Sequence, residues 1–337
     1  MKVNRKFIAE KAGVSTTTVS YVINNTPSTR ISEEVKKRVL RIARKYNYIP
    51  DASAKALVTG KTNNLGFIYK SSITDFFADP FTREVFTGLE REIEENDYSL
   101  MFALLEKHKG EGLSTSARKM LSGRFVDGVI LYGDIGIEIV KNLKAAGTPF
   151  VLVDYLLDEI SCNSILPDNR RGAKQAVQYL LSEGCRNICC LNGDLEEFYH
   201  PAYDERPSGY RDVMSDANLP CNIVSTKPDI DSSYLTTMNI LTEGKCPDAF
   251  FATGDHMAIG CVRAIIDYNP SLIGQVRVIG FDDISWDELE KPALSSIRVP
   301  KLEMGAEAVK ILLNEINSGN DSTKTLRLDT QLVVRDT

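Results

Sequence analysis

The sequence predicts two structural parts, an all-α module at the N-terminus and a larger α/β body built on parallel sheets. Residues 1–62 show short helical patterns and carry 13 Lys and Arg against 4 Asp and Glu, a formal charge of +9. The remainder holds 27 basic and 42 acidic residues, a formal charge of −15. In this remainder, apolar strand-like runs alternate with amphipathic helical patterns, which is typical of parallel sheets covered by helices on both faces.

The composition narrows the class of protein. The chain has 337 residues, of which 43% are hydrophobic and 26% are charged, as expected for a globular protein of two or three domains. No apolar run reaches the roughly 18 residues of a membrane helix, and residues 1–11 are too polar for a signal-peptide core. We therefore expect a cytoplasmic protein without a membrane partner. The seven cysteines form no C-x-x-C pair, so neither a metal site nor a disulfide framework is expected.

The basic module begins with a pattern of two short helices joined by a tight turn. Asn4 and Ser15 are typical helix N-caps, and Gly13 permits the left-handed backbone that ends a helix. The second helix is expected to run from Thr16 to about Asn24. Such a pair is a helix-turn-helix, and a third helix that starts after Ser32 completes a small shared core.

Double-stranded DNA is the partner that this module predicts. Lys and Arg that neutralise phosphates release counterions, although charge asymmetry alone is also compatible with a solvated basic face. The outward positions of the second helix carry groups that can bond phosphates or base edges in the major groove. These positions are Thr16, Thr17, Ser20, Tyr21 and Asn24. The alternative is that Thr and Ser near the helix start serve only as caps.

Two stretches of the chain resemble the LacI/GalR family of transcription regulators. Residues 8–24, IAEKAGVSTTTVSYVIN, resemble its headpiece, and residues 48–57, YIPDASAKAL, are similar to its hinge. The resemblance implies a hinge that becomes helical on operator DNA and inserts an apolar wedge into the minor groove. The matching residues are Ala54, Lys55 and Leu57. The alternative is a plain linker with Leu57 packed on the body.

The resemblance also implies a function, that of a sequence-specific transcription regulator controlled by a small-molecule effector. A repressor is the expected form. A near-palindromic operator requires a two-fold symmetric protein, so we expect a homodimer. Residues 328–337 contain no leucine heptad of the kind that makes tetramers. Whether the effector releases or strengthens DNA binding is left open, because both occur in the family.

The body is similar to the periplasmic-binding-protein-like core of the same family, which has two Rossmann-like lobes. The implied domains are a headpiece at 1–49, a hinge at 50–61 and an effector-binding core at 62–337. The implied lobes span about 62–160 with 292–322 and about 161–291 with 323–337, with crossovers near 159–163, 289–293 and 319–325. Apolar runs predict strands at Leu65–Tyr69, Ser99–Leu105, Gly128–Tyr132, Phe150–Asp154, Asn187–Asn192, Ala249–Thr253 and Val276–Phe281.

Ligands of open α/β sheets bind beyond the carboxyl ends of the strands. This rule selects acidic and aromatic residues that follow the expected strands, namely Tyr132, Asp154, Tyr155, Asp255, Asp282 and Asp283. The family resemblance adds Asp79, Phe81, Arg206 and Trp286. Carboxylates, aromatic rings and an arginine in one cleft suit a polyhydroxy ligand. A small neutral sugar is therefore the expected effector.

Several alternatives concern this cleft. A purine or nucleoside stacked between Phe81 and Trp286 is the other effector class. Whichever the effector, the alternative for Asp255 is that it only caps the following helix. The alternative for Phe81 and Trp286 is ordinary packing within the lobes. The family often has a polar side chain at the position of Gly254, and some members have one at Val299, so these contacts are absent here.

An enzyme on the same scaffold is the main rival function, because a fold does not determine an activity. The sequence holds no phosphate-binding glycine loop, nucleophile elbow or HExxH motif. His108, His200 and His256 lie far apart in sequence, so no catalytic residue and no cofactor are predicted. A sugar-binding transport protein or an architectural DNA binder would leave either the headpiece or the cleft without a role.

Overall fold

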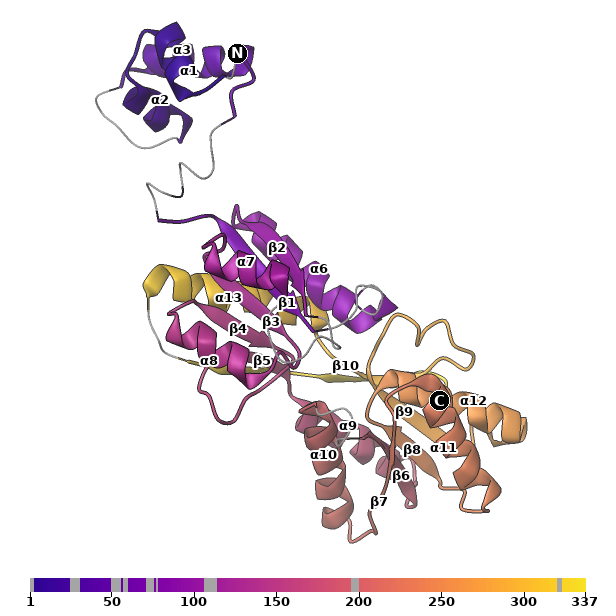
Figure 1. The fold of residues 1–337 in the computed structure, drawn as a ribbon. Helices are drawn as coiled ribbons and strands as arrows, with labels where there is room; N and C mark the ends of the chain where they lie inside the picture. The colour runs from indigo at the N-terminus through magenta and orange to yellow at the C-terminus, as the bar shows by residue number, and fades with distance from the viewer. Residues whose placement is uncertain are drawn as a thin grey trace. The chain divides into compact units, whose positions relative to one another are not determined.

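The computed structural model describes residues 3–24, 31–49, 56, 60–70, 76, 78–105, 114–194, 200–319 and 323–337. It divides into two compact units, Met1–Asn63 and Asn64–Thr337. The elements of each unit are labelled in Figure 1. Among the described residues, no helix combines the length and apolar character that crossing a bilayer requires.

The first unit contains three short helices, α1 (Arg5–Ala12), α2 (Thr16–Ile23) and α3 (Glu33–Lys45). Each helix starts at the cap that the sequence predicts. The side chain of Asn4 accepts a hydrogen bond from the Phe7 amide, and Ser15 accepts one from the Thr18 amide. Ser32 caps α3 in the same way, and Gly13 closes α1 with a φ of 66°.

The three helices share one small apolar core. Ile8, Val19 and Val39, one from each helix, are fully buried. At the edge of this core the rings of Phe7 and Tyr46 meet edge to face, 5.0 Å apart. The helix-turn-helix unit with a third supporting helix is thereby confirmed.

The second unit contains two six-stranded sheets, each covered by helices. The first sheet has the order β11-β5-β4-β3-β1-β2 and is parallel throughout. Its strands are β1 (Asn64–Tyr69), β2 (Ser99–Leu104), β3 (Gly128–Tyr132), β4 (Phe150–Val153), β5 (Asn163–Pro167) and β11 (Thr325–Leu328). This sheet and its helices α6 (Pro80–Glu95), α7 (Thr115–Ser122), α8 (Ile137–Ala145) and α13 (Lys301–Ser318) are called the first lobe.

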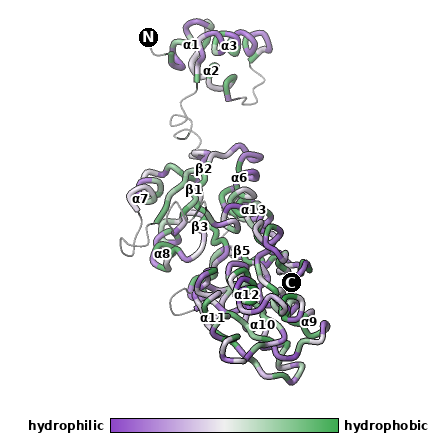
Figure 2. The backbone as a smooth tube through the Cα atoms, turned by 90° about the vertical axis from the view of Figure 1, so that its right-hand side faces the viewer, coloured by the Kyte–Doolittle hydropathy of each residue, from purple (hydrophilic) through white to green (hydrophobic). Residues whose placement is uncertain are grey.

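The second sheet has the order β12-β10-β9-β8-β6-β7, and only the pair β10 and β12 is antiparallel. Its strands are β6 (Ile188–Gly193), β7 (Asn222–Thr226), β8 (Ala249–Ala252), β9 (Arg277–Asp282), β10 (Ser295–Arg298) and β12 (Gln331–Val333). The second lobe comprises this sheet, helices α9 (Asn169–Ser182), α10 (Ala202–Asp216), α11 (Ile230–Thr242) and α12 (Asp255–Tyr268), and the short 3₁₀ helix η1 (Pro270–Leu272). Figure 2 shows hydrophobic residues concentrated along central strands such as β1 and β3.

The chain changes lobe later than the sequence predicts. Strands β5 and β11 belong to the first sheet and β10 belongs to the second, so the crossovers follow Pro167, Arg298 and Leu328. These strands have only four or five residues each, too few to show a clear pattern. The limits of the headpiece and hinge stay predictions, and Ala54, Lys55 and Leu57 lie outside the described residues.

Two glycines allow helices α6 and α13 of the first lobe to pack backbone to backbone. A Cβ atom on Gly88 would lie 1.9 Å from the Leu302 carbonyl oxygen, and one on Gly305 would lie 2.1 Å from that of Val85. The N-terminal turns of both helices thereby reach the same end of the first sheet, and residues of both turns take part in the site described next.

Candidate ligand-binding site

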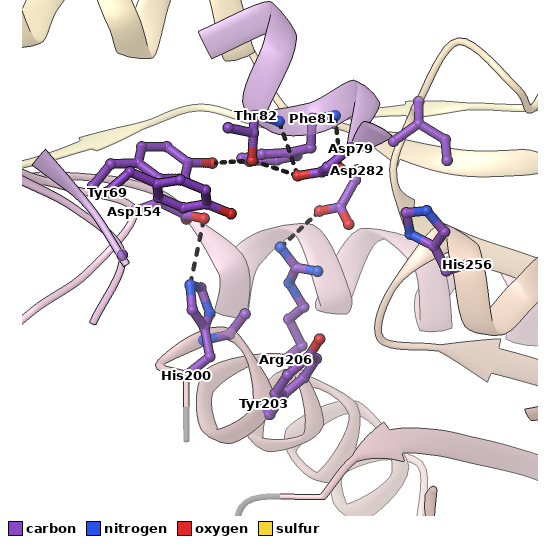
Figure 3. Close-up of a pocket in the computed structure, with 14 residues that line it drawn as sticks. Tyr69, Asp79, Phe81, Thr82, Asp154, His200, Tyr203, Arg206, His256 and Asp282 are labelled. Atoms are coloured by element: carbon purple, nitrogen blue, oxygen red, sulfur yellow. Dashed lines mark hydrogen bonds and ion pairs between the residues drawn. The ribbon is translucent and has the colours of Figure 1, made fainter. Parts of the chain in front are cut away.

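A cavity of about 300 Å³ lies where residues from both lobes meet, at the carboxyl ends of the strands (Figure 3). From the first lobe it is lined by Tyr69, Asp79, Phe81, Thr82, Tyr132, Gly133 and Asp154. From the second lobe it is lined by His200, Ala202, Tyr203, Arg206, His256, Asp282 and Ile284. A volume of this size lies at the lower end of the range for small-molecule sites.

Arg206 is the most constrained side chain of the cavity. It is only 4% exposed, and each of its three nitrogens donates to the second lobe. Nε donates to Oδ1 of Asn169 (2.9 Å), Nη1 to the carbonyl of Thr253 (2.7 Å) and Nη2 to Oδ1 of Asp282 (2.9 Å). The guanidinium also stacks on Phe281, 3.7 Å from the ring centre. Because an arginine has five N–H donors, two have no partner among the described residues and are left for a ligand.

Asp282 ends β9 in a backbone conformation that favours glycine. Its φ is 116° and that of Asp283 is 53°, and the buried ammonium of Lys301 donates to both carbonyls (2.6 and 2.8 Å). Burial raises the pKa of Asp282, while the charges of Arg206 and Lys301 act in the opposite direction. The two cations thus hold the carboxylate and its strained turn at the cavity wall.

The opposite wall is built on the N-terminus of α6. Asp79 caps this helix, since its carboxylate accepts hydrogen bonds from the amides of Phe81 and Thr82, both at 3.1 Å, and from the Thr82 hydroxyl. The hydroxyls of Thr82 and Tyr132 are 3.3 Å apart. Burial, followed by the charges of Asp154 and Asp79, raises the pKa of Tyr132 well above its usual range. Tyr132 therefore presents a neutral phenol.

Asp154 supplies an acceptor that nothing in the described part of the chain uses. The residue is 9% exposed and follows β4 with a φ of 58°. Its Oδ2 lies 3.4 Å from Nε2 of His200, whereas its Oδ1 is buried without a hydrogen-bond partner among the described residues. An unsatisfied buried carboxylate oxygen is costly, and a ligand donor would remove that cost.

The structure brings six of the ten predicted cleft residues to the cavity, namely Asp79, Phe81, Tyr132, Asp154, Arg206 and Asp282. Tyr155 lies behind it, buried with its ring 6.3 Å from that of His200. Trp286 lies behind His256, 5.3 Å from ring to ring. Asp283 is not part of the lining, and its carboxylate accepts hydrogen bonds from Arg298 and Arg335. The roles of all ten in binding stay predictions.

Five polar lining residues escape the sequence analysis, Tyr69, Thr82, His200, Tyr203 and His256. Tyr69 ends β1, so the strand-end rule that selects Tyr132 also applies to it. Thr82 and His256 directly follow the predicted Phe81 and Asp255, whereas Tyr203 and His200 precede Arg206 by three and six residues. The direction of these side chains depends on helix geometry that composition does not reveal.

Asp255, the fourth predicted residue outside the lining, is fully buried and has structural partners. Its carboxylate accepts hydrogen bonds from the Ser296 hydroxyl (2.6 Å) and the Ile284 amide (3.1 Å), and it pairs with the buried carboxyl of Asp287. Burial and the Asp287 charge raise the pKa of Asp255 well above its usual range. Burial raises the pKa of Asp287 to about 7. The pair joins α12 to β10 and to the turn after β9.

The predicted DNA-contacting residues of α2 lie on its solvent-facing side. Thr16, Thr17, Tyr21 and Asn24 are exposed and Ser20 is half-buried. The Asn24 amide donates to the Ser20 hydroxyl at 3.3 Å. Their contact with bases stays a prediction.

A helix-turn-helix unit combined with a two-lobed core around a ligand-sized cavity defines a class, the ligand-responsive DNA-binding regulators. Two family models match the chain. Residues 6–51 match "Bacterial regulatory proteins, lacI family" and residues 177–337 match "Periplasmic binding protein-like domain". The described residues hold no group of His, Cys, Asp or Glu suited to a metal ion.

Relatives that match almost the whole chain identify the family. The chain is 32% identical over 338 residues to the "Ribose operon repressor" of Haemophilus influenzae, covering 98% of this chain and 97% of the relative. It is 30% identical over 341 residues to the "HTH-type transcriptional repressor PurR" of Vibrio campbellii, with the same coverage. The protein belongs to the LacI family of bacterial transcription regulators, and these relatives are named as repressors.

Solved structures agree on the fold. A lac repressor dimer bound to operator and the anti-inducer ONPF is similar with a TM-score of 0.85 at 24% identity, covering 100% of this chain and 99% of that one. A complex of the regulator CelR with cellobiose has a TM-score of 0.70 at 25% identity and covers 99% of each chain. The expected headpiece and periplasmic-binding-protein-like core are thereby confirmed.

The Asp255 and Asp287 pair predicts a pH-dependent stability. An unfolded Asp titrates near pH 4, whereas Asp287 in the folded protein titrates at about 7. The folded state therefore binds the proton more tightly, and its stability falls as the pH rises from about 4 to 7. Asp287→Asn removes this cost, so the variant should gain stability relative to the wild type as the pH rises. The difference in unfolding free energy, variant minus wild type, should be more positive at pH 8 than at pH 5.

Urea unfolding of the full-length protein at both pH values measures this difference. Asp216→Asn, on an exposed position of α10, is the matched control and should show no such change. Parallel pH profiles for the wild type and Asp287→Asn would contradict a buried acid pair.

Proposed function

We propose that this regulator is a homodimeric repressor in the cytoplasm that binds a near-palindromic operator, and that a small neutral carbohydrate in the cavity between its lobes controls it. The observation that carries the proposal is that each lobe presents hydrogen-bonding groups without a described partner to the cavity. Two N–H groups of Arg206 and the unpartnered Oδ1 of Asp154 are a donor set and an acceptor on opposite lobes. A hydroxyl both donates and accepts, so neighbouring hydroxyls of one sugar satisfy both.

The charge of the cavity favours a neutral ligand. Three carboxylates, those of Asp79, Asp154 and Asp282, line it, while Arg206 is its one lining Lys or Arg among the described residues. Lys301 adds a second positive charge behind the wall. An anionic sugar would meet net repulsion at close range, whereas the aromatic rings of Phe81 and Tyr132 offer faces to the C–H groups of a neutral sugar.

D-ribose is the first ligand to test. The relative in Haemophilus influenzae is named a ribose operon repressor, and a LacI family regulator of Enterococcus faecium has been solved with bound ribose. A purine or nucleoside is the second candidate, because the name PurR recurs among relatives at 28–30% identity. The expected stack between two rings is less favoured, since Phe81 lines the cavity and Trp286 does not.

We infer that DNA is read by α2. The residues proposed to contact operator bases or phosphates are Thr16, Thr17, Ser20, Tyr21 and Asn24, joined in the minor groove by Ala54, Lys55 and Leu57 of the hinge. Two observations support this inference. The polar side chains of α2 are largely exposed, and residues 1–62 carry a formal charge of +9, which favours binding to phosphates. The proposed role is regulatory binding rather than catalysis.

Selection from a random DNA library tests the DNA-binding proposal. The full-length protein should enrich a palindromic site, and Thr17→Ala and Tyr21→Ala should each weaken binding to it by about 0.5–1.5 kcal/mol per lost hydrogen bond. Arg206→Ala, in the other unit, should leave binding without effector nearly unchanged. Enrichment of no palindrome would refute the proposal.

The single tryptophan tests the effector proposal. Trp286 packs on His256, which lines the cavity, so ligand binding should change its fluorescence. Titration with D-ribose, D-xylose, D-glucose and adenosine should identify at least one sugar that binds. Arg206→Ala should weaken that binding by about 1.5–3 kcal/mol, the usual value for hydrogen bonds to a charged group.

The control for this titration is Arg211→Ala, an exposed arginine on the same helix α10. It should bind the sugar as the wild type does. A sugar whose affinity survives Arg206→Ala unchanged would place the ligand elsewhere, and a response to adenosine alone would replace the sugar by a nucleoside.

A further inference from the structure

His200 and Asp154 meet across the cavity from different lobes. His200 lies two residues before α10 in the second lobe, and Asp154 follows β4 of the first lobe. Nε2 of His200 lies 3.4 Å from Oδ2 of Asp154 (Figure 3). Both side chains are largely buried, at 26% and 13% exposure.

The contact made by Nδ1, the other ring nitrogen of His200, indicates whether the imidazole is charged and which nitrogen carries its proton. The backbone amide of Ala202 donates to Nδ1 at 3.2 Å. A nitrogen that accepts an N–H bond carries no proton, so the imidazole is neutral and its proton is on Nε2. In this tautomer the N–H of Nε2 is on the side of the ring that faces Asp154, with 3.4 Å between Nε2 and Oδ2.

This donor determines which carboxylate oxygen is left for a ligand. Oδ2 of Asp154 faces Nε2 of His200, while Oδ1 is buried and unpartnered among the residues that the structure describes. The rings of Tyr155 and Tyr203 flank the imidazole, with centroids 6.3 and 6.0 Å away. His200 is therefore placed to orient the carboxylate.

Two other pairs between the lobes do not involve an acceptor that faces the cavity. Arg327 of β11 donates to both carboxylate oxygens of Glu205 (3.0 and 2.7 Å), and Arg83 reaches the Ser285 hydroxyl at 3.5 Å. Neither pair includes an oxygen that faces the cavity unused. Of these three pairs between the lobes, only the pair of His200 and Asp154 includes a residue with an unpartnered oxygen at the cavity.

We propose that His200 is a positioning residue of the effector site. Its Nε2–H orients Asp154 across the lobes so that Oδ1 accepts a hydrogen bond from a ligand hydroxyl, and binding of that hydroxyl favours the arrangement in which the lobes are joined. This inference rests on the proposed function, because it assigns His200 a part in sugar recognition at the same cavity.

The tautomer is tested without any ligand. Nitrogen NMR of the full-length protein labelled at its three histidines, at pH 8, should show His200 as the Nε2–H form, with its signal assigned by its loss in His200→Gln. An Nδ1–H form or an imidazolium would overturn the proposal, because Nδ1 would no longer accept from Ala202.

The positioning role is tested with D-ribose, followed by Trp286 fluorescence. His200→Ala should weaken binding about tenfold, the effect of losing about 1.4 kcal/mol. His200→Gln, whose amide places an N–H near the position of Nε2, should stay within about threefold of the wild type. In an Asp154→Asn background, His200→Ala should cause little further loss, since coupled residues are not additive.

The possible outcomes separate the two proposals. Equal losses for His200→Ala and His200→Gln, or additive losses with Asp154→Asn, would overturn positioning while leaving the sugar site intact. If D-ribose does not bind the wild type, the same variants are measured with the sugar that the titration identifies. If no sugar binds, the proposed function fails, and the inference drawn from it fails with it, whichever tautomer the NMR shows.

Discussion

The buried guanidinium of Arg206 is the interaction on which the site depends. A buried charge is tolerated only when it is paired and hydrogen-bonded, and here its partners come from the start of α9, the end of β8 and the end of β9. The same guanidinium therefore fixes the position of three elements relative to α10. Its partner Asp282 lies in a positive-φ turn, which in turn is held by Lys301 from the first residue of α13. The ion pair of Arg206 and Asp282 thus organises this end of the second lobe, and Lys301 ties it to the first lobe.

A ligand between two lobes acts only through its different affinity for their arrangements. The Glu205 and Arg327 pair lies beside Arg206 in sequence and beside the last crossover, so it ties the base of α10 to the first sheet. Lys301 joins the lobes at the second crossover. Neither contact uses the cavity groups that have hydrogen-bonding capacity left, those of Asp154 and Arg206. A ligand bound to both would therefore add a further link between the lobes.

Much of the architecture could be predicted from the sequence, because helix caps and apolar runs are local patterns of neighbouring residues. The three helix caps and all seven predicted strands are observed, with strand ends within one residue of the predicted ones. The missed strands depend on tertiary partners. In β10, Ser295 and Ser296 are fully buried because Thr337 and Asp255 satisfy their hydroxyls, and no local pattern shows that. The site residues likewise divide into those that local patterns or the family motif predict and those that depend on tertiary packing. Strand ends and the family motif predicted Asp154, Asp282 and Arg206, whereas the direction of Asp255 away from the cavity and the approach of His200 follow from packing between distant segments.

The central claim is that sugar binding in the cavity and operator binding by the headpiece are coupled. It is measured most directly by the anisotropy of a labelled operator fragment, titrated with the full-length protein with and without a saturating sugar from the fluorescence titration. We expect the operator Kd to change at least about fivefold, the lower range of allosteric coupling, and the sugar Kd to change by the same factor when operator is bound. An operator Kd that is identical with and without saturating sugar would contradict the claim.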